Sequence, residues 1–158
     1  MELTIEQALQ QGVAAHKEGK LQDAERLYRA ILQSQPLHPD ANHNLGILAV
    51  SVNKADAALA LFKTALEANP KIEQFWLSYI DALIKEKHFE MAKAVLEQGK
   101  KKGLSKDIVE AAETQLTSTA QVNEPKLAGQ KKRLSFSERR KELAENKKKK
   151  KAKKQDLK

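Results

Sequence analysis

The 158-residue sequence contains no cysteine, one tryptophan and only six glycines. The absence of cysteine excludes disulfide frameworks, thiolate metal sites and cysteine nucleophiles. The longest apolar run covers residues 45–50, far short of the roughly 18 residues that a membrane-spanning helix needs. No basic stretch precedes an apolar run at the N-terminus, so a leader peptide is not expected. We therefore expect a cytoplasmic protein without a transmembrane segment.

Positive charge is concentrated in the last third of the chain. Lysine and arginine number 29 against 21 acidic residues, which gives a net charge of +8. Residues 1–104 hold 13 basic and 13 acidic side chains, whereas residues 105–158 hold 16 and 8. An acidic partner is therefore expected for the C-terminal part and not for the rest.

The sequence repeats itself with a period of 34 residues over about two thirds of its length. The matching pairs are Gly12 and Gly46, Ala24 and Ala58, Tyr28 and Phe62, Leu32 and Leu66, and Pro36 and Pro70. A third copy keeps Ala92 and Leu96 but has Ile80 in place of glycine and Leu104 in place of proline. Apolar residues recur at helical spacing on both sides of a turn signal, so each copy predicts a pair of helices.

Local signals place the helix ends. Thr4 followed by Gln7 predicts a capping box at the first helix, and Pro36 and Pro39 end the second helix because proline lacks an amide donor. A further helix is expected over residues 105–118, with Ser105 as its N-cap and an apolar stripe on one side. The predicted pairs are about 5–17 with 21–34, 41–52 with 55–69, and 72–85 with 89–101.

The period, the small residues and the terminal prolines resemble the tetratricopeptide repeat. The small residues would let paired helices approach closely, and Tyr28, Phe62 and Leu96 would fill the space between successive pairs. The resemblance implies an all-α fold, an α–α superhelix of three helix pairs with a C-terminal capping helix and a basic, partly helical or disordered tail. The implied boundaries within residues 4–104 are about 5–38, 39–72 and 73–104, followed by the cap 105–118, a linker 119–130 and a lysine-rich tail 131–158.

No arrangement of residues predicts catalysis. His38 and His43 have no third ligand at metal-site spacing, and the glycines form no phosphate-binding loop. The carboxylates are spread over helix surfaces, so none is expected to act as a general acid. We expect no enzyme, no cofactor and no metal.

In the family that the repeats resemble, the first helix of each pair lines a concave groove for an extended peptide or a partner helix. Val13 stands where the carboxylate-gripping subgroup needs asparagine, so a carboxylate clamp is not expected. For Asn44, a solvated helix position and a role in binding a peptide backbone both stay open. The expected contacts, carried over position by position, are His16, Lys17, Asp40, His43, Asn44, Ile47, Asp81 and Lys85. The wider expected lining adds Glu6, Leu9, Val13, Val50, Ser51, Gln74, Leu77 and Ile84.

The tail is expected to act through charge. Residues 126–158 contain 15 basic and 4 acidic side chains, too few of them apolar to build a core. Such a tail suits a tether, contact with nucleic acid, or contact with anionic lipid or an acidic protein, and the sequence does not separate these. The unbroken lysine run consists of Lys147, Lys148, Lys149, Lys150 and Lys151.

The function expected from these features is that of a protein-binding adaptor or scaffold. One alternative is the N-terminal regulatory module of a larger transferase, or a descendant of one, because bacterial proteins of the resembled family carry such modules. Another alternative is a nucleic-acid-associated factor that acts through its tail. The partner and the oligomeric state stay open.

Overall fold

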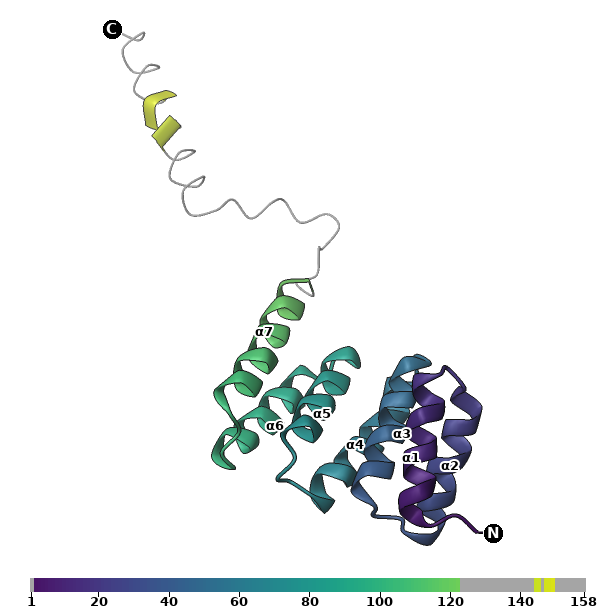
Figure 1. Ribbon diagram of the computed structural model, residues 1–158. Coiled ribbons are helices and arrows are strands. Elements are labelled where there is room, and N and C mark those ends of the chain that lie inside the picture. The colour runs from purple at the N-terminus through teal and green to yellow at the C-terminus, as the bar shows by residue number, and fades with distance from the viewer. Residues whose placement is uncertain (1, 123–143, 146, 150–158) are drawn as a thin grey trace, which may run out of the picture. The chain divides into compact units, whose positions relative to one another are not determined.

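The computed structural model describes residues 2–122, 144–145 and 147–149. Figure 1 shows the helices succeeding one another in chain order, from α1 and α2 at one end to α7 at the other. No strand occurs among the described residues, so the all-α prediction is confirmed. The helices are α1 (Ile5–Lys17), α2 (Leu21–Ser34), α3 (Pro39–Ser51), α4 (Ala55–Ala68), α5 (Glu73–Lys85), α6 (Phe89–Lys101) and α7 (Lys106–Val122).

The capping box at α1 is confirmed. The Gln7 amide donates to Thr4 Oγ1 over 3.1 Å, and the Thr4 amide donates to Gln7 Oε1 over 3.0 Å. Helix α3 begins at Pro39, two residues before the predicted start, because proline suits the first turn of a helix. His38 caps this helix by accepting the Ala41 amide proton at Nδ1 over 3.2 Å.

Glycine allows close packing inside the first two pairs. A Cβ atom at Gly12 would lie 2.6 Å from Cε1 of Tyr28, and one at Gly46 would lie 2.5 Å from Cε1 of Phe62. Each ring therefore packs on the glycine of its own pair. Tyr28 also belongs to a cluster with Leu45 of the next pair, so the expected filling between pairs is only part of its role.

The third pair carries a larger core. Trp76, Tyr79, Ile80, Leu83 and Ile84 of α5 are all buried. Helix α7 closes this core, with Ala112 fully buried and Val109 and Leu116 packed beside it. The structure thus has three helix pairs and a capping helix.

Helix α7 begins at Lys106, directly after the predicted N-cap Ser105, but the Ser105 hydroxyl has another partner and the helix ends later than predicted. The amide and hydroxyl of Ser105 both donate to the Glu73 carboxylate, over 2.7 and 3.1 Å, so this hydroxyl ties the turn before α7 to the start of α5. The helix also runs through residues 119–122, which were predicted to be linker. The hydroxyls of Thr117, Ser118 and Thr119 donate to carbonyls one turn earlier, so they are accommodated in the helix.

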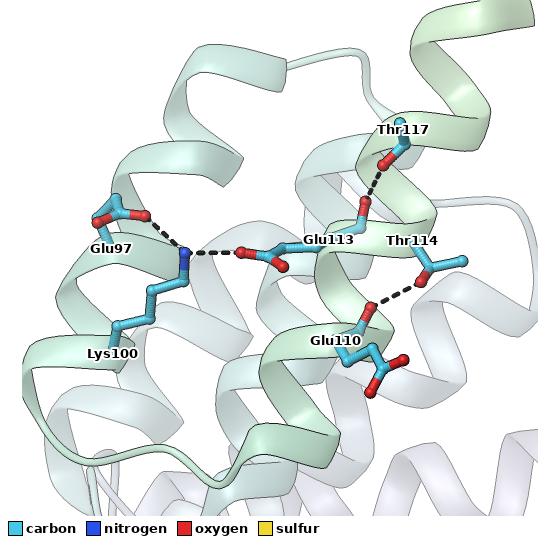
Figure 2. A network of polar contacts seen from close by, with 6 residues as sticks. All are labelled: Glu97, Lys100, Glu110, Glu113, Thr114 and Thr117. Atoms are coloured by element: carbon cyan, nitrogen blue, oxygen red, sulfur yellow. Dashed lines mark hydrogen bonds and ion pairs between the residues drawn. The ribbon is translucent and has the colours of Figure 1, made fainter.

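One face of α7 is polar where the same face of α5 is apolar. The apolar face of α5 consists of Trp76, Tyr79, Ile80 and Leu83. The positions 34 residues later, in α7, hold Glu110, Glu113, Thr114 and Thr117, in the same order. Figure 2 shows Lys100 of α6 bridging Glu97 and Glu113, with Nζ to oxygen distances of 2.9 and 2.7 Å. The positions of α7 equivalent to the apolar face of α5 are therefore polar, and one of them, Glu113, is turned toward α6.

The other predictions for the tail concern residues 123–143, 146 and 150–158, which lie outside the described residues. These include most of the predicted linker, and also Lys150 and Lys151. Residues 144–145 and 147–149 are helical, and Lys147, Lys148 and Lys149 are exposed.

Candidate peptide-binding groove

A cavity of about 240 Å³ opens between α3 and α5, the first helices of the second and third pairs. Its apolar lining consists of Ile47 and Val50 of α3, Phe62 of α4 and Ala82 of α5. The polar lining residues are Ser51, Ser78, Asp81 and Lys85.

Helical geometry explains why these residues meet. Ile47, Val50 and Ser51 share one side of α3 because residues three and four apart lie above one another. Asp81 and Lys85 share one side of α5 for the same reason and stand 34 residues after Ile47 and Ser51. Equivalent positions of two repeats therefore face one space, which we call the α3–α5 groove.

Asp81 is the most unusual charge in the groove. The residue is half-buried, and burial raises the pKa of its carboxyl group, while the nearby Lys85 ammonium group acts in the opposite direction. Within residues 2–122 no hydrogen bond or ion pair to this carboxylate is formed. A partly desolvated carboxylate without a donor favours a partner that brings one.

His43 lies beneath the groove and not on its surface. Only 7% of the residue is exposed, and its ring centroid lies 4.6 Å from that of Phe75. Its Nε2 atom shares a hydrogen bond of 2.9 Å with Ser78 Oγ, which also accepts from Gln74 Nε2. Burial lowers the pKa of His43, and the charge of Asp40 raises it by less. His43 thus joins α3 to α5 and is not offered to a partner.

Comparison with known proteins agrees with this architecture. Models of the tetratricopeptide repeat match residues 9–71 and residues 49–116, so together they cover well over half of the chain. The chain belongs to the tetratricopeptide-repeat family. No curated protein matches its sequence.

Several solved tetratricopeptide-repeat structures share the fold at low identity. The Sgt2 domain from Aspergillus fumigatus is 20% identical, with a TM-score of 0.64 over 75% of this chain and 81% of that one. The secretion chaperone SycD from Yersinia enterocolitica, in complex with a peptide of the translocator YopD, is 16% identical, with a TM-score of 0.62 over 77% and 93%. The first repeat domain of Spaghetti (RPAP3), bound to an HSP90 peptide, is 18% identical, with a TM-score of 0.61 over 73% and 91%.

The structure of this tetratricopeptide-repeat chain brings three of the eight predicted groove residues into the cavity, namely Ile47, Asp81 and Lys85. Asn44 lies half-buried one turn before Ile47, and Asp40 is exposed near the start of the same helix. His16 and Lys17 lie at the end of α1, outside this cavity.

Three lining residues were missing from the predicted groove. Phe62 belongs to a second helix, and it reaches the groove because Gly46 leaves room for its ring. Gly46 was therefore the signal for Phe62. Ser78 and Ala82 were passed over because small side chains carry little pattern, although they lie on the same side of α5 as Asp81.

The described part of the chain holds neither a metal-binding cluster nor a membrane-spanning helix. No group of three or more histidine, aspartate or glutamate side chains there is arranged to hold a metal ion. Among the described helices, none is long and apolar enough to cross a membrane.

Proposed function

We propose that the protein is a non-enzymatic adaptor that binds a peptide or a partner helix in the α3–α5 groove. The observation that carries this proposal is the apolar cavity beside a half-buried, unpaired Asp81. Proteins of this fold typically act as adaptors and chaperones, and two of the similar structures contain bound peptides.

The groove offers three kinds of contact to such a partner. An apolar side chain of the partner fits against Ile47 and Phe62, where burial of its surface provides most of the free energy of binding. Asp81 accepts a hydrogen bond or pairs with a cation, and Lys85 donates one turn further along. Asn44 can both donate to a carbonyl and accept from an amide of an extended backbone.

Site-specific cross-linking tests this proposal. Ile47 is 37% exposed, so a photoreactive benzoylphenylalanine at this position can reach a bound partner. The matched control carries the same group at Gln33, an exposed residue of α2. We expect partner proteins cross-linked at Ile47 and absent at Gln33. Equal capture at both positions would place the binding surface outside the groove.

A titration then measures the groove's contribution. A peptide from the cross-linked region of the partner is titrated into the full chain and into Asp81→Ala. Loss of a charge-assisted hydrogen bond typically costs about 1.5–3 kcal/mol, so binding should weaken at least about tenfold. Asp56→Ala, on the exposed start of α4, is the control and should leave the affinity unchanged. Equal affinities for all three proteins would exclude Asp81 from the interface.

For the tail we propose electrostatic contact with an anionic surface. The described lysines Lys147, Lys148 and Lys149 are exposed, which supports such contact. Retention on a heparin column should weaken with rising salt and should fall when residues 126–158 are deleted. Unchanged retention after the deletion would rule out this role. The alternative that the chain is the regulatory module of a transferase stays a prediction. A gene for a transferase next to the gene of this protein would favour it.

A further inference from the structure

Helix α5 faces a second cavity on the side turned away from the groove. This cavity has a volume of about 390 Å³ and lies between α4 and α6. Trp76 and Tyr79 of α5 lie at its base, and Leu66, Pro70 and Val95 make the rest of its apolar lining. On a helix of 3.6 residues per turn, Trp76 points about opposite to Ser78 and Asp81, so the two cavities use different faces of α5.

The aromatic base of this cavity is specific to the third pair. The positions 34 residues before Trp76 and Tyr79 hold Asn42 and Leu45. The Trp76 indole donates from Nε1 to the carbonyl of Pro70 over 2.8 Å, which fixes its orientation. A Cβ atom at Gly99 would lie 3.2 Å from Cε3 of Trp76, so this glycine lets α6 approach the indole closely. The cavity therefore has a rigid aromatic base before any ligand arrives.

The rim of the cavity has an excess of positive charge. Its charged residues are Lys63, Glu67 and Lys102. Lys63 Nζ lies 3.9 Å from Glu67 Oε1, and both side chains of this loose ion pair are largely exposed. None of the ion pairs among the described residues includes Lys102, which replaces Ala68 of the preceding repeat. One ammonium group at the edge is thus left to meet an anion.

We propose that this cavity is a second peptide-binding site, which takes one large apolar side chain flanked by carboxylates. Its volume falls in the range of ligand pockets, and a mostly apolar lining with a few charged groups is typical of them. The apolar side chain packs on Trp76 and Tyr79, and a neighbouring glutamate or aspartate of the peptide pairs with Lys102. The site is independent of the α3–α5 groove, so one chain can hold two partners at once.

Trp76 provides a direct reporter because it is the only tryptophan of the chain. The full-length protein, labelled with ¹⁵N, gives one indole N–H signal in a two-dimensional NMR spectrum. The probe is a blocked pentapeptide with a central leucine and two glutamates on each side. We expect a saturable shift of the indole signal at millimolar peptide. Matched pentapeptides with central glycine, or with lysines in place of the glutamates, should shift it much less.

Charge-reversal variants localise the contact. Lys102→Glu should weaken binding of the acidic peptide about fivefold, the size expected when one partner of an exposed ion pair is replaced. The neighbouring Lys101→Glu, which changes the net charge equally but does not line the cavity, should weaken it less. Asp81→Asn in the α3–α5 groove should have no effect. Lys101 and Lys102 are exposed and Asp81 is half-buried, and thermal melts verify that each variant folds.

Four results of these experiments would contradict the second peptide-binding site. Absence of a saturable shift with the leucine peptide would overturn the proposal, as would equal binding of the lysine peptide. Equal losses in Lys101→Glu and Lys102→Glu would show attraction to general surface charge and would also overturn it. If Asp81→Asn changed the affinity in either direction, the peptide would be binding in the groove, and the second site would be refuted while the proposed function stood.

Discussion

The second and third helix pairs occupy the same 34-residue frame but fill it differently. The α3–α4 pair packs Gly46 against an aromatic ring of Phe62, whereas the α5–α6 pair has Ile80 and Leu96 at these positions. In both pairs a side chain donates to a prolyl carbonyl, from Asn42 Nδ2 in one and from Trp76 Nε1 in the other. The repeat therefore conserves places and contacts rather than residue types.

This comparison shows how one frame produces two surfaces. Large side chains on α5 build the broad core that holds α7, and they also create the aromatic cavity beside α4 and α6. Small side chains on α3 leave the space into which Phe62 reaches toward the groove. Exchanging residues between equivalent positions is thus the most direct way to test the comparison.

The largest effect is expected for Trp76→Asn, which gives the third pair the residue of the second. The amide can still donate to Pro70, but the lost indole leaves a cavity in the core. We expect a loss of about 3–5 kcal/mol in the free energy of unfolding, measured by urea denaturation. A loss below about 1 kcal/mol would mean that the carbonyl bond, and not the ring, holds this position.

Gly46→Ala should cost about 1–3 kcal/mol because its methyl group would collide with the Phe62 ring. Helix propensity alone predicts the opposite sign, since alanine is favoured over glycine by about 1 kcal/mol. The control is Ala57→Gly at an exposed position of α4, which should also lose stability, here through propensity alone. A gain for Gly46→Ala in thermal denaturation would contradict the close approach.

Tyr28→Phe should stabilise the protein by about 1 kcal/mol. The Tyr28 hydroxyl is buried without a hydrogen-bond partner among the described residues, and burial raises its pKa. Phenylalanine already occupies the equivalent position 62. Urea denaturation of the variant and of wild type measures the difference, and a loss of stability would show that the hydroxyl is satisfied in solution.

The smallest effect is expected for His43→Leu, and it concerns pH. Because burial lowers the pKa of His43, the unfolded chain takes up a proton as the pH falls through about 6.5, where the folded chain does not. Stability of wild type should therefore decrease from pH 7 to pH 5. Leucine, found at the equivalent position 77, should reduce this slope, and an unchanged slope would show that His43 binds protons equally in the folded and the unfolded chain.

Much of the fold follows from sequence because its signals are local or periodic. The Thr4–Gln7 box, the helix breaks and the spacing of Gly12 and Gly46 require no knowledge of tertiary structure. The end of α7 was missed because the linker was assigned from the composition after Ser118, where Pro125, Gly129 and few apolar residues occur. Residues 119–122 nevertheless continue the helix.

The groove was harder to predict because periodicity gives the side of a helix but not the depth of a residue. Ile47 and His43 lie on neighbouring parts of α3, yet Ile47 is 37% exposed and His43 only 7%. The difference arises from Phe75 on α5, whose ring covers His43. That contact depends on how the third pair docks, and no single-repeat pattern contains it.

The polar positions of α7 that replace the apolar face of α5 have a consequence for engineering. Anyone who wishes to lengthen this array by grafting another hairpin after α7 would first have to rewrite Glu110, Glu113, Thr114 and Thr117 as apolar residues. With polar side chains there, α7 offers a further helix pair little apolar surface to bury, which is the property of a capping element in a stacked array.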